Sequence, residues 1–483
     1  RRSSDLFSTM MKHGFAPDSF LTSSIYPIPK NKRKLLTDSD NYRGIALSSI
    51  LGKVLDRIIL CENSENLNSS QLQFGFKEDH STTQCSFVLT ECVNYYKTNG
   101  SNVHMVFLDA SKAFDRVEYV KLFSLLVKRG ICPITVRLLL NMYVNQYISV
   151  VWGDKMSAPF KCSNGVKQGG VLSPILFGIY LDELLVSLKR SGLGCYIGNI
   201  FSGALAYADD VVLVAPTLSG MSRMLNICMQ FGIEYHVKFN PQKTKHMYIG
   251  NTKECSSLYL DGKPIDLVDY FVHLGNIIEF NRNGNDVKNS VRKFQTDVNM
   301  VMAQFGNVFP ETRYKLFKMY CMSLYGCQLW DFSRKEVNSF YTAWRKAVRF
   351  VWKIPYNSHC NLLHFICDDL PVEVQMHKRF VKFFHKILNS NNCLVHACGV
   401  LALEGSCSPA CNSLNTILPQ YDLSKHTFFQ HNLNFSVQKI NCSVLGESYD
   451  DTKTTAILVR ELCQARDGQL STILTRPAIV ESI

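Results

Sequence analysis

The sequence lacks the features that would place it in a membrane or outside the cell. No apolar run reaches the about 18 residues of a membrane-spanning helix. The first residues, "RRSSDLFSTMMKHGF", contain neither the apolar core nor the cleavage site of a signal peptide. The 18 cysteines are scattered through apolar segments, which fits reduced thiols better than a disulfide framework. We therefore expect an intracellular protein, nuclear or cytoplasmic and not secreted, with no membrane partner.

Other absences concern the organisation of the chain. It contains no short repeat or low-complexity tract, and it does not begin with methionine, which suggests a chain cut from a longer protein. The spacing of a zinc knuckle is also missing from the one cluster rich in Cys and His, which consists of Cys393, His396, Cys398, Cys407 and Cys411. We expect core or surface thiols there rather than a zinc site.

The composition that is present is ordinary for a globular protein, with a mild excess of positive charge. The 483 residues are 46% hydrophobic and 19% charged. A chain of this length divides into about two to four domains. Lys plus Arg exceed Asp plus Glu by 52 − 40 = 12. This balance suits a polyanionic partner such as nucleic acid, but it fits a merely basic enzyme equally well.

Hydrophobic periodicity and turn residues predict an α+β body followed by a mainly helical part. The body is expected to contain strands at 24–30 and 103–109 and a hairpin around Asp209. Its expected helices cover 48–60, 81–96, 118–129, 134–146, 173–190 and 218–234, with Ser173 as the N-cap of the fifth. From residue 286 three helices rich in aromatic and basic residues follow, whereas residues 400–483 are polar and read as irregular.

The stretch "GALAYADDVVLVAP", residues 203–216, places Asp209 and Asp210 side by side inside an apolar run. Such a pair can simply bond the amides of a turn. In a dry hairpin, however, two like charges repel and raise each other's pKa unless a cation neutralises them. A second buried strand ends on Asp109, for which a helix N-cap is the alternative role. Carboxylates from two buried strands suit a pair of Mg²⁺ ions roughly 3.5–4 Å apart, the arrangement used in nucleotidyl transfer.

Seven segments resemble, in the same order, the motifs of reverse transcriptases from non-LTR (LINE-type) retrotransposons. They are "NYRGIALSSILGKVLDRII" (41–59), "LQFGFKEDHSTTQ" (72–84), "FLDASKAFDRV" (107–117), "NGVKQGGVLSPILF" (164–177), "YADD" (207–210), "FNPQKTKHM" (239–247) and "HLG" (273–275). The likeness covers residues 20–280 and extends more loosely to 390. It implies a right-hand polymerase fold of the α+β class, in which fingers and an antiparallel palm sheet backed by helices precede a helical thumb.

The resemblance also implies domain boundaries. The fingers with an N-terminal extension would occupy 1–100, and the palm, with part of the fingers inserted, 101–280. The helical thumb would occupy 281–355, where Lys293, Arg313, Lys315, Lys318, Arg345, Lys346 and Arg349 would form a face for an RNA–DNA duplex. Residues 356–483 would form a C-terminal helical or irregular region of unknown role.

Catalytic and nucleotide-binding roles follow from the resemblance, residue by residue. It makes Asp109, Asp209 and Asp210 the ligands of two Mg²⁺ ions, for which Mn²⁺ could substitute, and Lys243 the general acid that protonates pyrophosphate. Phe114 would be the steric gate that excludes a 2′-hydroxyl. The incoming nucleotide would also meet Lys30, Arg43, the carbonyl of Ala110, Gln168 and Gly169. The alternatives are surface cations for the lysines and Arg43, a core ring for Phe114 and a plain turn for Gly169. Asp115 does not match a metal-ligand position, and we expect it to be a structural partner.

Partners follow from the same resemblance. Template RNA would contact Gly75, Phe76, Lys77 and Ser81, and the primer DNA 3′ end would contact His273, Leu274 and Gly275. The third partner is the dNTP, and an endonuclease domain is expected in the parent polyprotein. One alternative is a decayed or domesticated copy that binds RNA or RNA–DNA hybrid without catalysis. Another is an intron maturase, which would require a distinct intron-binding domain after the thumb.

Overall fold

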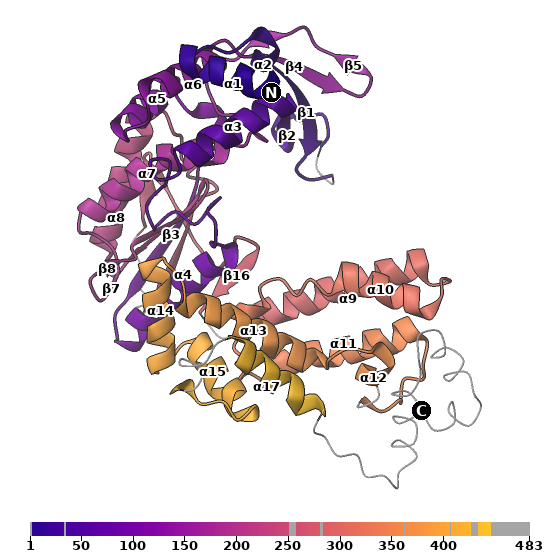
Figure 1. Ribbon diagram of the computed structural model, residues 1–483. Helices are drawn as coiled ribbons and strands as arrows, with labels where there is room; N and C mark the ends of the chain where they lie inside the picture. The colour runs from indigo at the N-terminus through magenta and orange to yellow at the C-terminus, as the bar shows by residue number, and fades with distance from the viewer. Residues whose placement is uncertain are drawn as a thin grey trace. The chain divides into compact units, whose positions relative to one another are not determined.

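The computed structural model describes residues 2–32, 35–250, 257–280, 284–360, 363–405, 407–426 and 433–445 (Figure 1). The chain divides into two compact units, and each is described by itself. The first comprises residues 1–85 and 100–268, and the second comprises residues 86–99 and 269–483. Helix α4 (Thr82–Thr98) begins in the first unit and continues in the second.

The first unit is built on a five-stranded sheet in the order β14-β11-β3-β10-β9. Its strands are β3 (Val103–Asp109), β9 (Ala204–Tyr207), β10 (Asp210–Ala215), β11 (Lys245–Ile249) and β14 (Asp266–Leu267). All neighbours are antiparallel except β11 and β14. Every residue of β3 except the last is buried, because helices cover the sheet: α7 packs on β9, and α8 on β10. The expected antiparallel sheet backed by helices is confirmed.

A second five-stranded sheet lies earlier in the same unit. It contains β1 (Thr22–Pro29), β2 (Tyr42–Ser48), β4 (Tyr147–Trp152), β5 (Lys155–Met156) and β6 (Phe160–Lys161). Strand β1 pairs antiparallel with β2 and parallel with β4. Short hairpins are formed by β7 (Tyr196–Ile197) with β8 (Ile200–Phe201), and by β12 (Tyr259–Leu260) with β13 (Lys263–Pro264).

The helices of the first unit lie within two residues of their predicted bounds, apart from the first two, which were not predicted. They are α1 (Arg2–His13), α2 (Asp18–Leu21), α3 (Ile50–Glu62), α5 (Tyr119–Lys128), α6 (Pro133–Val144), α7 (Ser173–Arg190) and α8 (Leu218–Glu234). The bounds predicted for β3, α7 and α8 match residue for residue. The predicted cap of α7 is wrong, because Ser173 is already the first helical residue and Leu172 holds the N-cap position without a side-chain bond.

In its described residues the second unit is helical apart from one hairpin, β15 (Tyr270–His273) with β16 (Asn276–Glu279). Its helices are α9 (Asn285–Phe305), α10 (Pro310–Cys321), α11 (Val337–Trp352), α12 (Leu363–Cys367), α13 (Val372–Leu388), α14 (Cys393–Glu404), α15 (Pro409–Gln420) and α17 (Leu433–Leu445). Helix α9 packs against both α10 and α11, with the rings of Phe294, Phe317 and Phe340 in contact between them.

The prediction of irregular structure after residue 400 is wrong for the last turn of α14 and for all of α15 and α17, which are helical. Helix α15 begins at a side-chain cap, since Ser408 accepts a hydrogen bond from the backbone N–H of Cys411, and Pro409 occupies its first turn. Its helical hydrophobic periodicity is weak, because small polar residues lie between the apolar positions, so the helix was not predicted. No single helix of the described ranges is long and apolar enough to cross a membrane, and α14 with α15 would meet that criterion only as a pair bent by 58°.

The predicted boundaries of fingers, palm and thumb are a finer division than these two units, and they stay predictions.

Candidate active site

The two adjacent aspartates lie at the tip of the β9–β10 hairpin. Asp210 is the first residue of β10 and pairs with Tyr207, so the turn consists of Ala208 and Asp209 alone. Ala208 has φ = 57°, a left-handed conformation that places its Cβ too close to the following carbonyl. Alanine does not favour this shape by itself, so contacts with the surrounding chain must impose it.

Strand register brings the third aspartate to the same place. Asp109 is the last residue of β3 and lies directly opposite Asp210 in the antiparallel ladder. Directly opposed residues project their side chains from the same face of a sheet. The backbone of Asp109 is held by Asn240, whose N–H donates to its carbonyl at 2.9 Å, and its own N–H donates to Thr244 Oγ1 at 3.4 Å. The chain just before β11 therefore fixes the end of β3.

Charge at this site is unbalanced. Burial raises the pKa of Asp209, and the neighbouring charge of Asp109 adds to the rise, while Arg43 opposes it. Burial also raises the pKa of Asp210 to about 6, with further contributions from Asp209 and Asp109 and again an opposing one from Arg43. Lys243 Nζ lies 3.8 Å from Asp109 Oδ2. Asp209 and Asp210 are thus ionised at neutral pH only at a cost that Arg43 partly offsets.

This arrangement predicts that replacing Asp210 by Asn stabilises the cation-free protein at neutral pH. A carboxyl whose pKa rises on folding favours the folded state below its ordinary value of 3.8, and that contribution is lost as the pH rises through about 6. Because residue Asp210 retains exposed surface, the gain is small, about 1 kcal/mol or 2–4 °C in melting temperature. Thermal unfolding in EDTA should show Asp210→Asn above wild type at pH 7.5, with the difference much reduced at pH 4.5. Equal melting temperatures at both pH values would contradict this reading.

The residues present fit a divalent cation. Oδ2 of Asp109 is buried and accepts no hydrogen bond in the part of the chain described, and the facing strands supply hard carboxylate oxygens that repel one another. As the side chains stand, no group of three Asp, Glu, His or Cys residues within the described ranges is gathered into a formed metal site. Asp109, Asp209 and Asp210 remain the residues that would hold such ions.

The predicted triphosphate-binding cations lie beside the carboxylates in the first unit. Lys30 follows β1, and Arg43 in β2 lies near enough to Asp209 and Asp210 to affect the pKa of both. Lys30 Nζ donates to the carbonyl of Asp40 at 2.9 Å. The carboxylate of Asp40 in turn pairs with Lys112 at 2.8 Å, three residues beyond Asp109. The end of the β1–β2 hairpin is thus tied to the segment that follows Asp109, and its contact with a triphosphate stays a prediction.

Phe114 and Gln168 also lie together. The ring of Phe114 stacks on Phe177 of α7, with centroids 4.5 Å apart and planes at 17°. Gln168 Nε2 donates to Asp115 Oδ1 at 3.3 Å, which gives Asp115 the structural role expected for it. Gly169 has φ = 107°, and a Cβ there would lie 2.9 Å from the carbonyl oxygen of Ala46, so this glycine is required by close backbone approach. Ala110 is buried and forms an isolated antiparallel β-bridge with Phe239.

Two of the residues predicted to contact the template, Lys77 and Ser81, also have structural partners, and the template contacts stay predictions. Lys77 Nζ donates to the carbonyls of Ser69 and Ser70 at 2.6 and 2.7 Å, and burial lowers its pKa to about 8. Ser81 caps α4 by accepting a hydrogen bond from the N–H of Gln84. A template contact by Lys77 would require its two bonds to break. Phe76, in contrast, has an exposed ring on a left-handed backbone.

The predicted primer-binding residues belong to the second unit. His273 ends β15 and is buried, which lowers its pKa to about 4, so its imidazole is neutral at physiological pH. Leu274 and Gly275 form the two-residue turn of the β15–β16 hairpin, and both have positive φ. Tyr325 donates from its hydroxyl to the carbonyl of Leu274 at 2.6 Å and thereby fixes that turn. The primer contact of these three residues stays a prediction.

The predicted basic face of the helices after residue 286 needs correction. Arg313 is buried and donates to the backbone carbonyls of Val351, Gly306 and Val308. Arg349 is buried as well and donates to the carbonyl of Ser358. Both arginines therefore tie segments of the second unit together and are not available to a duplex. The exposed cations of the predicted set are Lys293, Lys315, Lys318 and Lys346.

Several residues that shape the site were not found from the sequence. Gln73 bonds the turn at Ala208, Thr244 bonds the end of β3, and Phe177 supports Phe114. Asp56 in α3 accepts hydrogen bonds from the backbone N–H groups of Val171 and Leu172, beside the Gln168 segment. All four lie within the seven motifs, but nothing in their spacing indicates what they contact.

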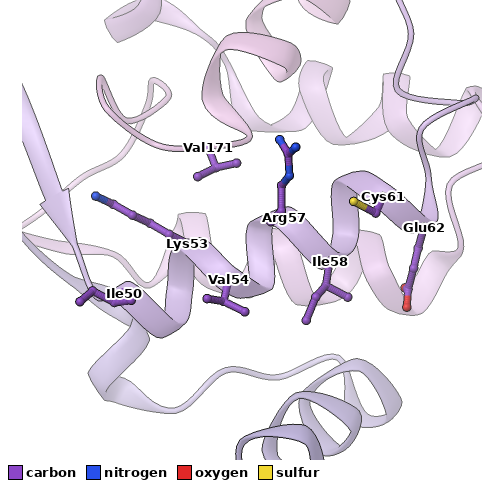
Figure 2. Close-up of a pocket in the computed structure, with 8 residues that line it drawn as sticks. All are labelled: Ile50, Lys53, Val54, Arg57, Ile58, Cys61, Glu62 and Val171. Carbon is purple, nitrogen blue, oxygen red and sulfur yellow. The ribbon is translucent and has the colours of Figure 1, made fainter. Parts of the chain in front are cut away.

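The shallow hollow in Figure 2 is separate from the acidic site. It measures about 560 Å³ and is lined by Ile50, Lys53, Val54, Arg57, Ile58, Cys61, Glu62 and Val171. All but Val171 come from α3, and the apolar side chains recur one helical turn apart along it. The predicted site residues, all of which are described, do not line it.

The chain is similar to several known proteins. An RNA-directed DNA polymerase from mobile element jockey of Drosophila funebris is 25% identical over 433 residues, covering 84% of this chain and 45% of that protein. The Pol polyprotein of the type-2 retrotransposable element R2DM of Drosophila melanogaster is 29% identical over 203 residues, covering 42% and 19%. The solved structure of apo telomerase from Candida tropicalis is 12% identical, covering 95% of this chain and 73% of that chain with a TM-score of 0.42.

The chain spans less than half the length of these two retrotransposon relatives. Residues 28–288, more than half of the chain, match the family described as reverse transcriptase (RNA-dependent DNA polymerase). The resemblance to the non-LTR retrotransposon proteins is thereby confirmed, and the chain belongs to the reverse transcriptase family.

Proposed function

We propose that this chain is the polymerase part of a non-LTR retrotransposon protein and extends a DNA 3′ end on an RNA template. The observation that carries the proposal is the register of Asp109 with Asp210, at a turn that also carries Asp209. Family membership supports it, because the reverse transcriptase family works with divalent metal ions. The proposal also includes the substrates, which are an RNA template, a DNA primer and dNTPs. It includes Mg²⁺ as the cation, with Mn²⁺ as a substitute, and an intracellular place of action. An endonuclease in the parent polyprotein belongs to it as well.

In this proposal each residue has a task that its position suits. Divalent cations, when bound, supply charge neutralisation for the attacking and leaving oxygens of the displacement. The three aspartates hold them, and Arg43 with Lys30 receives the triphosphate on the side of the β1–β2 hairpin. Phe114 lies beneath the sugar, supported by Phe177. Lys243, exposed and 3.8 Å from Asp109, provides a proton for the pyrophosphate.

Primer extension tests the function. Purified protein is incubated with poly(rA), oligo(dT) and labelled dTTP, with Mg²⁺, with Mn²⁺ or with EDTA. Incorporation that needs a divalent cation and stops in an Asp209→Asn/Asp210→Asn double variant is the expected result. Folded wild-type protein that binds the hybrid, measured by fluorescence anisotropy, but incorporates nothing on several template sequences would favour the non-catalytic alternative.

A further inference from the structure

We propose that Gln73 is a positioning residue that holds the Ala208–Asp209 turn in the shape needed by the paired aspartates. This inference rests on the proposed polymerase function. Gln73 is 1% exposed, and both ends of its amide contact the turn. Its Oε1 accepts hydrogen bonds from the backbone N–H of Ala208 at 2.9 Å and of Gly75 at 2.8 Å, while its Nε2 donates to the carbonyl of Ala208 at 3.3 Å.

The backbone around Gln73 reinforces this contact. Residues 72–75, the clamp segment, run parallel to β9, the edge strand of the central sheet, with Gln73 opposite Ala206. The N–H of Ala206 donates to the carbonyl of Leu72 at 2.9 Å, and the N–H of Phe74 donates to the carbonyl of Ala206 at 2.7 Å. The clamp segment therefore satisfies both backbone groups of Ala206, which lies on the free edge of β9 two residues before Ala208.

Gly75 completes the clamp segment by close approach. A Cβ at this position would lie 2.4 Å from the backbone nitrogen of Ala208 and 3.1 Å from the carbonyl carbon of Tyr207. A side chain there would push the turn away. This gives Gly75, for which the family resemblance implies a template contact, a structural reason to be glycine, because its α-carbon faces the hairpin.

Only a glutamine meets all the requirements at position 73. Its carboxamide accepts a hydrogen bond from the N–H of Ala208 and donates one to the carbonyl of the same residue. An ionised glutamate has no donor, and methionine has a similar length but neither the donor nor the oxygen acceptor. The need for such a clamp comes from Ala208, whose φ of 57° alanine rarely adopts unaided. If the turn relaxes, Asp209 and Asp210 move relative to Asp109 on the neighbouring strand. A misplacement of about 1 Å at a reacting centre can cost about 10²-fold in rate.

The decisive experiment compares Gln73→Met with Gln146→Met in the full chain. Gln146 is another buried glutamine, 2% exposed, whose side chain bonds Ser23 in the other sheet of the first unit. Single-turnover incorporation on poly(rA)/oligo(dT) is measured over a range of Mg²⁺ concentrations, with hybrid affinity and melting temperature determined in parallel. We expect Gln73→Met to lower the maximal rate about 10²-fold and to raise the half-saturating Mg²⁺ concentration. Hybrid affinity should be unchanged, and Gln146→Met should leave both kinetic values near wild type.

A double-variant cycle with Ala208→Gly separates positioning from general stability. Glycine adopts positive φ without strain, so the loss caused by Gln73→Met should be smaller in the Ala208→Gly background. Hydrogen exchange provides a measurement that does not depend on activity. Relative to wild type, the amides of residues 204–212 should exchange faster in Gln73→Met, whereas those of residues 103–109 should exchange at the same rate.

The outcomes are distinct. An inactive wild type on several template sequences defeats the proposed function itself. An active wild type with equal effects of Gln73→Met and Gln146→Met, an unchanged Mg²⁺ dependence or an additive cycle overturns the positioning role. If Gln73→Met does not fold, Gln73→Glu, which keeps the acceptor, is used in its place and must show the same Mg²⁺ shift.

Discussion

Asp109→Asn is expected to reduce RNA-templated DNA synthesis by at least about 10³-fold, because a metal ligand contributes several kcal/mol of transition-state stabilisation and each 1.36 kcal/mol is tenfold in rate. The substitution preserves the shape of the side chain at the end of β3, directly opposite Asp210. It also removes one source of the raised pKa values of Asp209 and Asp210, so the folded protein should lose no stability. Single-turnover incorporation rates on a saturating primer–template check the prediction.

The matched control is Asp261→Asn in the turn between β12 and β13. Asp261 is exposed and has φ = 51°, a conformation that asparagine tolerates as well as aspartate does. The chemical change is identical, but it lies in a separate two-stranded hairpin outside the five-stranded sheet that carries Asp109. Wild-type rates for Asp261→Asn are expected. A rate within tenfold of wild type for Asp109→Asn would remove this residue from the metal-binding set.

Phe114→Val is expected to admit ribonucleotides, lowering the preference for dTTP over UTP about 10–200-fold, the range that one apolar contact commonly supplies. The ring of Phe114 is half-buried and lies flat against Phe177, so it cannot swing aside to make room for a 2′-hydroxyl. Valine removes the outer part of the ring while keeping an apolar floor. The measurement is the ratio of kcat/KM for dTTP and UTP on poly(rA)/oligo(dT).

Phe123→Val is the control for lost packing. Phe123 is buried in α5 against the rings of Tyr119 and Tyr143, so the same truncation there tests the cost of a smaller core side chain. It should reduce the melting temperature and leave the sugar preference intact. If Phe114→Val still incorporates dTTP with an unaltered dTTP/UTP ratio, Phe114 is a packing residue and the gate lies elsewhere.

Local patterns in the sequence were sufficient to predict many of the helices and strands. The strand ending on Asp109 and helices α7 and α8 were predicted to the residue, because apolar runs and periodicity depend only on neighbours in the chain. The pairing of Asp109 with Asp210 could be inferred only from the family resemblance. Strand register depends on contacts between residues a hundred positions apart, which no short window contains.

The failures have physical reasons too. Arg313 and Arg349 are spaced like a solvated helix face. The guanidinium of Arg313 instead bonds carbonyls at the ends of α9 and α11, and that of Arg349 bonds the carbonyl of Ser358 beyond α11, uses that sequence spacing does not distinguish from phosphate binding. Alanine at position 208 gives no signal of a left-handed turn, since such turns are recognised by glycine or asparagine. The role of Gln73 could not be predicted either, because its contacts form only when residues 72–75 pack beside β9, which is more than 130 positions away in the chain.

The ladder between β3 and β10 also determines where this protein tolerates changes in length. Pairing, and not the number of intervening residues, sets Asp109 opposite Asp210, so the connection between them can grow without separating the two carboxylates. Gly198, in the β7–β8 turn of that connection, has open space around it and is a suitable point for inserting a tag or a small domain. One residue added within β3 or β10 has the opposite effect, because it turns every following side chain to the other face of the sheet.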